Sequence, residues 1–99
     1  MLDPKVRAIG ISWYNKDDYP RALRVMIDPH ILPSTYSAWK KKAEAQESKW
    51  KCEGIIVYRA IINPDEFPAW CRARGLNVDA KGRMAFASEF AMHQVGQTH

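Results

Sequence analysis

Cysteine, histidine and acidic residues are the side chains of this chain that could carry catalysis or bind a metal. Cys52 and Cys71 lie too far apart for a C-x₂-C ligand pair, and His30 has no thiol or carboxylate at ligand spacing. His93 and His99 lie near the end of the sequence, and no H-x₃-H or H-E-x-x-H arrangement occurs. The acidic pairs Asp17–Asp18 and Asp65–Glu66 fall at expected helix starts, where the helix dipole accounts for them. The sequence therefore predicts no catalytic residue, no metal site and no cofactor.

Cys71 is the residue on which an enzymatic hypothesis rests. A reactive cysteine needs a helix N-terminus or a nearby base to lower the pKa of its thiol. Cys71 is expected in the middle of a helix beside Trp70, which predicts an inert thiol. A small enzyme with a site near the Cys71 helix is therefore the third of three functional hypotheses.

Basic residues cluster in two places and make nucleic-acid binding the second hypothesis. Lys40, Lys41 and Lys42 follow Trp39, and such mixtures of aromatic and basic residues can bind single strands. Four further cations flank a turn that loosely resembles a helix-turn-helix: Arg72, Arg74, Lys81 and Arg83. Trp39 and Trp50, however, lie eleven residues apart, or three helical turns, so both are expected to face the core while the lysines do not. The net charge of +4 is also modest for a nucleic-acid-binding protein. Nucleic acid is therefore not the favoured partner.

The leading hypothesis is a small non-enzymatic binding or regulatory module that acts through protein–protein contacts. Candidate contact residues for an unidentified protein partner are Trp13, Tyr14, Arg59 and Arg83. Trp13 and Tyr14 would act as exposed aromatic anchors, although coverage of the core is the favoured interpretation for Trp13.

Arg83 interrupts the apolar face of the last predicted helix. A charged side chain there must either reach solvent or meet a buried acid. The favoured interpretation is a side chain that extends outward from the first turn. The alternatives are a partner-binding arginine and a structural ion pair with Asp79, Glu66 or Asp28.

Two segments have the character of β-strands. The aliphatic run from Gly54 to Ile62 predicts the central strand, with a fully apolar face at Ile56, Tyr58, Ala60 and Ile62 that helices should cover. The alternation from Val6 to Trp13 predicts its pairing partner, in which Gly10 would let another backbone come close.

Four amphipathic helices complete the predicted fold. Ser34 is expected to cap the second helix, Asp65 the third and Asp79 the fourth. Their predicted extents are 19–27, 35–52, 66–74 and 80–93. The last helix is expected to carry Met84 on its apolar face. The fold class is thus α+β: one helix-rich domain spanning 1–99 in the order βααβαα, with an ordered core of about 6–93 and a frayed tail at 94–99.

A sheet of two strands is marginal by itself and leaves open edges. The second face of the central strand, formed by Ile55, Val57, Arg59 and Ile61, is only partly polar. We therefore expect a two-fold homodimer in which two sheets join edge to edge or the second faces meet.

Composition is that of an ordinary globular protein, with 46% hydrophobic and 26% charged residues. No apolar run approaches the roughly 20 residues that span a bilayer, and the first residues do not resemble a signal peptide. These features predict a cytoplasmic protein with no membrane contact and with reduced thiols.

Two motifs resemble those of small bacterial cytosolic proteins of unknown function. The first is the Gly-x-Ser-Trp-Tyr opening at Gly10–Tyr14, and the second is the Phe-x-x-Trp-Cys helix at Phe67–Cys71, followed by Gly-Leu and a helix rich in Ala, Arg and Phe. The resemblance covers about residues 9–90. It implies a bacterial cytosolic origin and no activity, so no functional residue is carried over.

Overall fold

The chain is described by a computed structural model for residues 7–96. Its regular elements are β1 (Ala8–Trp13), α1 (Tyr19–Val25), α2 (Tyr36–Cys52), β2 (Ile56–Ile61), α3 (Phe67–Ala73) and α4 (Ala80–Gly96), with short 3-10 turns η1 (Lys16–Asp18) and η2 (Pro29–Ile31). The predicted α+β class and the order βααβαα are confirmed.

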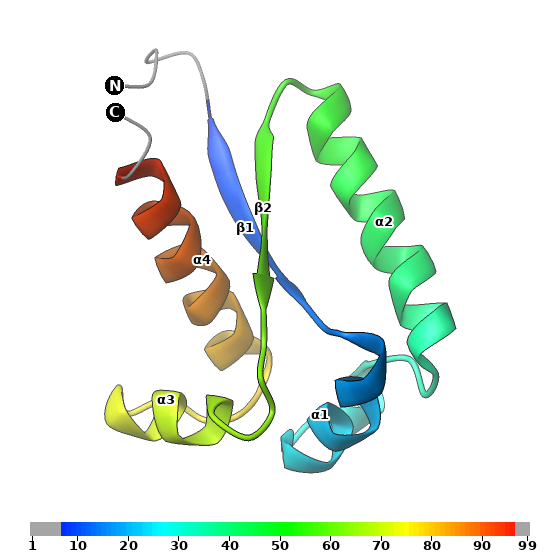
Figure 1. Ribbon diagram of the computed structural model, residues 1–99, viewed down its shortest axis with the longest axis vertical. Coiled ribbons are helices and arrows are strands. Elements are labelled where there is room, and N and C mark those ends of the chain that lie inside the picture. The colour runs from blue at the N-terminus through cyan, green and yellow to red at the C-terminus, as the bar shows by residue number, and fades with distance from the viewer. Residues whose placement is uncertain (1–6, 97–99) are drawn as a thin grey trace.

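β1 and β2 form a two-stranded parallel sheet, in register from Ala8 opposite Ile56 to Trp13 opposite Ile61. A parallel pair needs a long crossover connection, and the chain supplies it through α1 and α2. Figure 1 shows the two strands between α4 on one side and α2 on the other, with α1 and α3 at the end where both strands finish.

Gly10 sets how closely α4 approaches the sheet. A Cβ atom at Gly10 would lie 2.0 Å from the carbonyl oxygen of Ala87 and 3.1 Å from the Cβ of Ala91. Only glycine fits this contact between two backbones. The expectation that Gly10 admits another backbone is therefore confirmed, and α4 packs mainly against β1.

Aromatic side chains fill the core between β1, α1 and α2. The Trp13 and Trp39 rings meet edge to face at 4.9 Å, and Tyr14 meets Trp39 in the same way at 5.0 Å. Trp39 is buried, while Trp50 and Trp70 are half-buried. Trp13 and Trp39 belong to the core and Trp70 packs against it. The prediction that Trp50 shares the core-facing side of the helix with Trp39 was therefore wrong in part.

Coverage of the sheet differs in part from the prediction. Ala60 and Ile62 are fully buried as expected, but Ile56 on the same face is 37% exposed because α4 lies over β1 rather than over the start of β2. Met84 was expected on the apolar face of α4 and is instead exposed. Glu47, a charged residue of α2, is buried.

Several predicted helix boundaries were wrong. α1 ends at Val25 rather than Ile27, because Met26 is extended and the Ile27 N–H donates to the Val78 carbonyl. The cap of α2 is Thr35 rather than Ser34, since the Thr35 hydroxyl accepts from the Ala38 N–H at 3.2 Å.

The last two helices also differ from their predicted ends. Asp65 does not cap α3, because the helix begins at Phe67 and its N-cap residue is Glu66, which makes no side-chain cap hydrogen bond. α4 continues to Gly96 rather than ending near His93, so the prediction of a frayed tail was wrong for residues 94–96. Val6 and residues 97–99 lie outside the described residues.

Candidate functional site

The outer edge of β1 carries backbone groups that point away from the sheet. The Arg7 carbonyl accepts from the Ile56 N–H at 2.9 Å, and the Trp13 carbonyl accepts from the Ile62 N–H at 2.8 Å. Successive strand residues direct their N–H and C=O groups to opposite edges. The even-numbered residues Ala8, Gly10 and Ser12 therefore direct theirs away from β2.

A groove follows this edge. One hollow of about 680 Å³ lies between β1 and the second half of α4, and another of about 370 Å³ lies between β1, α2 and the first half of α4. Both include Gly10, so they adjoin along the strand. We call these two adjoining hollows together the β1 groove. Its principal lining residues are Ala8, Gly10, Ser12, Met84, Ser88 and Met92.

Two methionines on α4 stand beside the β1 groove. Met84 is 70% exposed and Met92 is 74% exposed, the highest values among the large hydrophobic side chains described. Each lies four residues from Ser88, so all three share one side of the helix. Flexible, exposed methionines are common where a protein surface adapts to a partner.

β1 lacks the features that usually protect an edge strand. Natural edges carry lysine, proline or a covering element, because unpaired strands recruit other strands. The strand Ala8–Trp13 contains neither a charged residue nor a proline. Among the residues described between 7 and 96, Arg83 is the one charged side chain that lines the β1 groove, and it is paired with Asp28.

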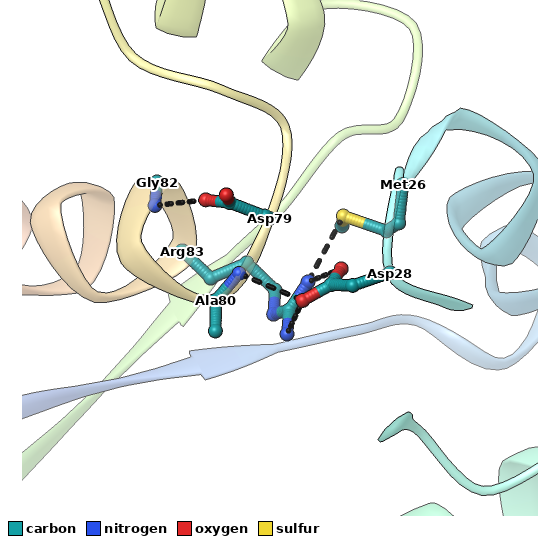
Figure 2. A network of polar contacts seen from close by, with 6 residues as sticks. All are labelled: Met26, Asp28, Asp79, Ala80, Gly82 and Arg83. Carbon is teal, nitrogen blue, oxygen red and sulfur yellow. Dashed lines mark hydrogen bonds and ion pairs between the residues drawn. The ribbon is translucent and has the colours of Figure 1, made fainter. Parts of the chain in front are cut away.

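Arg83 binds Asp28 at the base of this region (Figure 2). Its Nη1 donates to Asp28 Oδ1 at 2.8 Å and to the Met26 sulfur at 3.3 Å, and its Nη2 donates to Asp28 Oδ2 at 3.1 Å. Arg83 is only 6% exposed. The favoured prediction of an outward side chain was therefore wrong, and the alternative of an ion pair with Asp28 is confirmed.

The same network fixes the start of α4. Asp28 Oδ2 also accepts from the Ala80 N–H at 3.0 Å, and Asp79 Oδ1 accepts from the Gly82 N–H at 3.1 Å. The hydrogen bonds from Arg83, assisted by its charge and by the Ala80 N–H, hold the pKa of Asp28 below its usual value. The Asp28–Arg83 pair is thus a structural clamp between the segment after α1 and α4.

The other predicted partner-contact residues are largely engaged within the fold. Trp13 and Tyr14 are buried, so the expectation of exposed anchors was wrong and coverage of the core is confirmed for Trp13. Burial raises the pKa of Tyr14 to about 12.

Arg59 lies over the Trp13 ring at 3.8 Å and donates to both carboxylate oxygens of Glu47, at 2.7 and 2.8 Å.

Glu47 was missed as a structural residue. The Arg59 hydrogen bonds hold its pKa below the usual value, with burial acting in the opposite direction. Its main partner, Arg59, lies on β2, so helical spacing alone could indicate only the weaker contact with Lys51, four residues along α2. The half-exposed Arg59 is therefore anchored rather than free.

The predicted basic residues do not form one surface. Lys40, Lys41 and Lys42 are exposed on α2, and two of the cations near the α3–α4 turn, Arg72 and Lys81, are also exposed. Arg74, however, donates to Glu89 at 2.8 Å and lies over the Trp70 ring. Arg74 is exposed but paired, and Arg83 is buried, so two of the four cations of the helix-turn-helix interpretation are already engaged within the fold.

A shallow hollow on α2 gathers a smaller basic group. Lys40 and Lys41 line it together with Lys16, which the sequence had not linked to them, and with Tyr36. Glu44 also lines this hollow and offsets part of its charge. The positive surface is therefore local.

Cys71 has the environment of an inert thiol. It is fully buried, and burial is the main reason that the pKa of its thiol is raised. A raised thiol pKa lowers the thiolate fraction at neutral pH, which opposes nucleophilic chemistry. Cys52, in contrast, is exposed at the end of α2.

Thiol labelling is expected to separate the two cysteines. In the native chain a thiol reagent at neutral pH should modify Cys52 promptly, whereas Cys71 should react only after denaturant unfolds the chain. Mass spectrometry of the labelled peptides gives the readout. Rapid native labelling of Cys71 would revive the enzymatic hypothesis.

Within residues 7–96 no group of three or more His, Cys, Asp or Glu side chains is placed to hold a metal ion. None of the helices described there has the length and apolar character needed to cross a membrane. Comparisons with protein-family models, curated proteins and solved structures found no match. The resemblance to small bacterial proteins therefore remains a prediction.

Proposed function

We propose that this chain is a small non-enzymatic binding module whose partner is a protein that adds a strand to the open edge of β1. The observation that carries the proposal is the juxtaposition, along one edge, of outward backbone groups at Ala8, Gly10 and Ser12 with an apolar groove. Strand addition uses main-chain hydrogen bonds for affinity and side-chain pockets for selectivity. The β1 groove supplies both.

Each layer of the groove has a role in this proposal. A strand beside β1 would place alternate side chains toward α4 and toward α2. On the α4 side it would meet Met84 and Met92, and on the α2 side Ala43 and Gln46. The partner strand is therefore uncharged and mostly apolar, and its source is either an unidentified protein or a second copy of this chain.

The cytoplasm is the proposed location. Both cysteines are free thiols, which suits a reducing compartment. Nucleic-acid binding remains the second candidate function, because Lys16, Lys40 and Lys41 share a hollow with an aromatic ring.

Ala8→Pro is expected to abolish strand addition while leaving the fold intact. The Ala8 N–H points away from β2, so proline removes a donor that only a partner would use, and proline is tolerated at the first residue of an edge strand. Proteins retained by the immobilised wild-type chain from a bacterial lysate should fall at least about tenfold with this variant. Thermal unfolding of the variant should match the wild type.

Ile9→Pro is the matched control, because its N–H faces β2. It should lower the free energy of unfolding by about 3 kcal/mol or more, since it removes a hydrogen bond within the sheet. The capture experiment is run with nuclease-treated and with untreated lysate. Proteins that are retained only from the untreated lysate are bound through nucleic acid. If Ala8→Pro retains the same proteins as the wild type, the β1 edge is not the binding site.

A further inference from the structure

We propose that the occupant of the β1 groove is a second copy of this chain, joined by antiparallel pairing of the two β1 strands about a two-fold axis at Gly10. The resulting sheet has the strand order β2-β1-β1-β2. The inference rests on the proposed function, which assigns strand addition to this edge, and it names the partner.

The outward backbone groups of β1 are arranged symmetrically about Gly10. An antiparallel pair centred there sets Ala8 opposite Ser12 of the second copy and Gly10 opposite its equivalent. Residues that face one another in this way exchange both N–H···O bonds. If the register between the two β1 strands shifted by one residue, backbone groups that point outward on one strand would face residues whose groups point toward β2 on the other. A shift of two residues would leave one end of each strand unpaired.

The side of α4 that faces the groove is symmetric about the same point. Gly10 packs beneath Ala87, and Ser88 is the neighbouring residue on the groove side. Met84 and Met92 lie four residues before and after Ser88, so the two-fold axis brings Met84 of one copy beside Met92 of the other. Small Ser88 lets the helices approach, and the flexible methionines fill the space on either side.

Charge also favours self-pairing at β1 over the other edge. No charged residue lies in Ala8–Trp13, so two copies meet there without local repulsion. β2 carries the charged Arg59 beside its outer edge, which is a common protection against pairing. Pairing through one edge about a two-fold axis closes the assembly at a dimer.

The net charge of +4 on each copy opposes association at long range. Salt screens this repulsion but does not weaken apolar contact, so the dimer should tighten when NaCl rises from about 50 mM to about 500 mM. Nucleic-acid binding would weaken over the same range. The direction of the salt effect therefore separates these two kinds of association.

A charge-pairing experiment tests the arrangement. Met84 and Met92 are exposed, so neither substitution should disturb the monomer, and circular dichroism should stay at the wild-type signal. M84E/M92E opposes like charges across the axis and should weaken dimerisation at least about 100-fold in sedimentation equilibrium. M84E/M92K opposes unlike charges and should restore a dimer. If the M84E/M92K variant is as monomeric as M84E/M92E, the antiparallel arrangement is wrong.

Disulfide trapping provides a second test. Ser88→Cys in a Cys52→Ser background should form a covalent dimer under mild oxidation, because the two thiols would lie at the axis. Ser37→Cys in the same background is the control, since it places an exposed thiol on α2 away from the groove. Equal cross-linking of both variants would indicate random collision and overturn the proposal.

Failure of this inference is distinguishable from failure of the proposed function. A wild-type chain that sediments as a monomer at high micromolar concentration overturns the homodimer. If such a monomer still captures another protein through a contact that Ala8→Pro removes, the edge binds a foreign strand. If neither association depends on Ala8→Pro, both proposals fail.

Discussion

Asp28→Ala is expected to lower the free energy of unfolding by about 3–5 kcal/mol, because it leaves the buried Arg83 without its counter-ion. Arg83 is held by both carboxylate oxygens of Asp28, and its side chain is only 7% exposed. The substitution also removes the acceptor of the Ala80 N–H at the start of α4. Urea unfolding followed by tryptophan fluorescence measures the loss.

Two control variants separate the charge from the hydrogen bonds. Asp28→Asn keeps an oxygen that can accept from Ala80 but removes the negative charge, so it should cost less than Asp28→Ala. Asp28→Leu with Arg83→Met removes both charges and fills similar space, and it should be milder than either single change at the pair. If the double variant loses as much as the sum of the single variants, the pair is not coupled.

The pH dependence of stability follows from the same pair. Because the pKa of Asp28 is lowered in the folded chain, its contribution is complete above the unfolded-state pKa of about 4. It is lost as the pH falls through the folded-state pKa. The stability difference between wild type and Asp28→Asn should therefore be largest near neutral pH and shrink in acid. Glu47 has a lowered pKa as well and remains in both proteins, so the comparison isolates Asp28.

The fold could be predicted because its main determinants are local. Alternation in β1, the aliphatic run of β2 and the tryptophan spacing of α2 each follow from one short stretch of sequence. Gly10 was identified for the same reason, since glycine within a strand marks a close approach. Helix ends were less accurate, because the choice between Ser34 and Thr35 depends on which hydroxyl reaches a backbone N–H.

The candidate site was only partly predictable, because its determinants are non-local. Arg83 pairs with an aspartate far away in the chain, so helical periodicity could suggest several acids without choosing between them. Methionine is an apolar residue, so its type alone predicted a buried Met84. Its exposure depends instead on where α4 lies across the strands. The open edge of β1 was expected from having only two strands. Assigning the outward-facing residues, however, requires the parallel register of β1 and β2, which the sequence did not predict.

Gly10→Ala is the second change expected to have a large effect, with a loss of at least about 2 kcal/mol in the free energy of unfolding. The added methyl carbon would lie 2.0 Å from the Ala87 carbonyl oxygen and 2.8 Å from its carbon. Neither atom can move without moving α4 or bending β1. Denaturant unfolding checks the loss. Gly96→Ala is the control, because no atom of residues 7–96 outside its own surroundings would lie within 4 Å of the added Cβ.

The source of the clash can itself be tested. In a Gly10→Ala background, Ala91→Gly removes the nearest side-chain atom, at 3.1 Å, but leaves the closer Ala87 carbonyl in place. It should therefore restore none of the lost stability, whereas a clash between side chains would be relieved.

Because displacement of α4 would also move Ser88 and the flanking methionines relative to β1, Gly10→Ala should weaken dimerisation even at temperatures where the monomer stays folded. A Gly10→Ala chain with wild-type stability would show that α4 does not rest against β1.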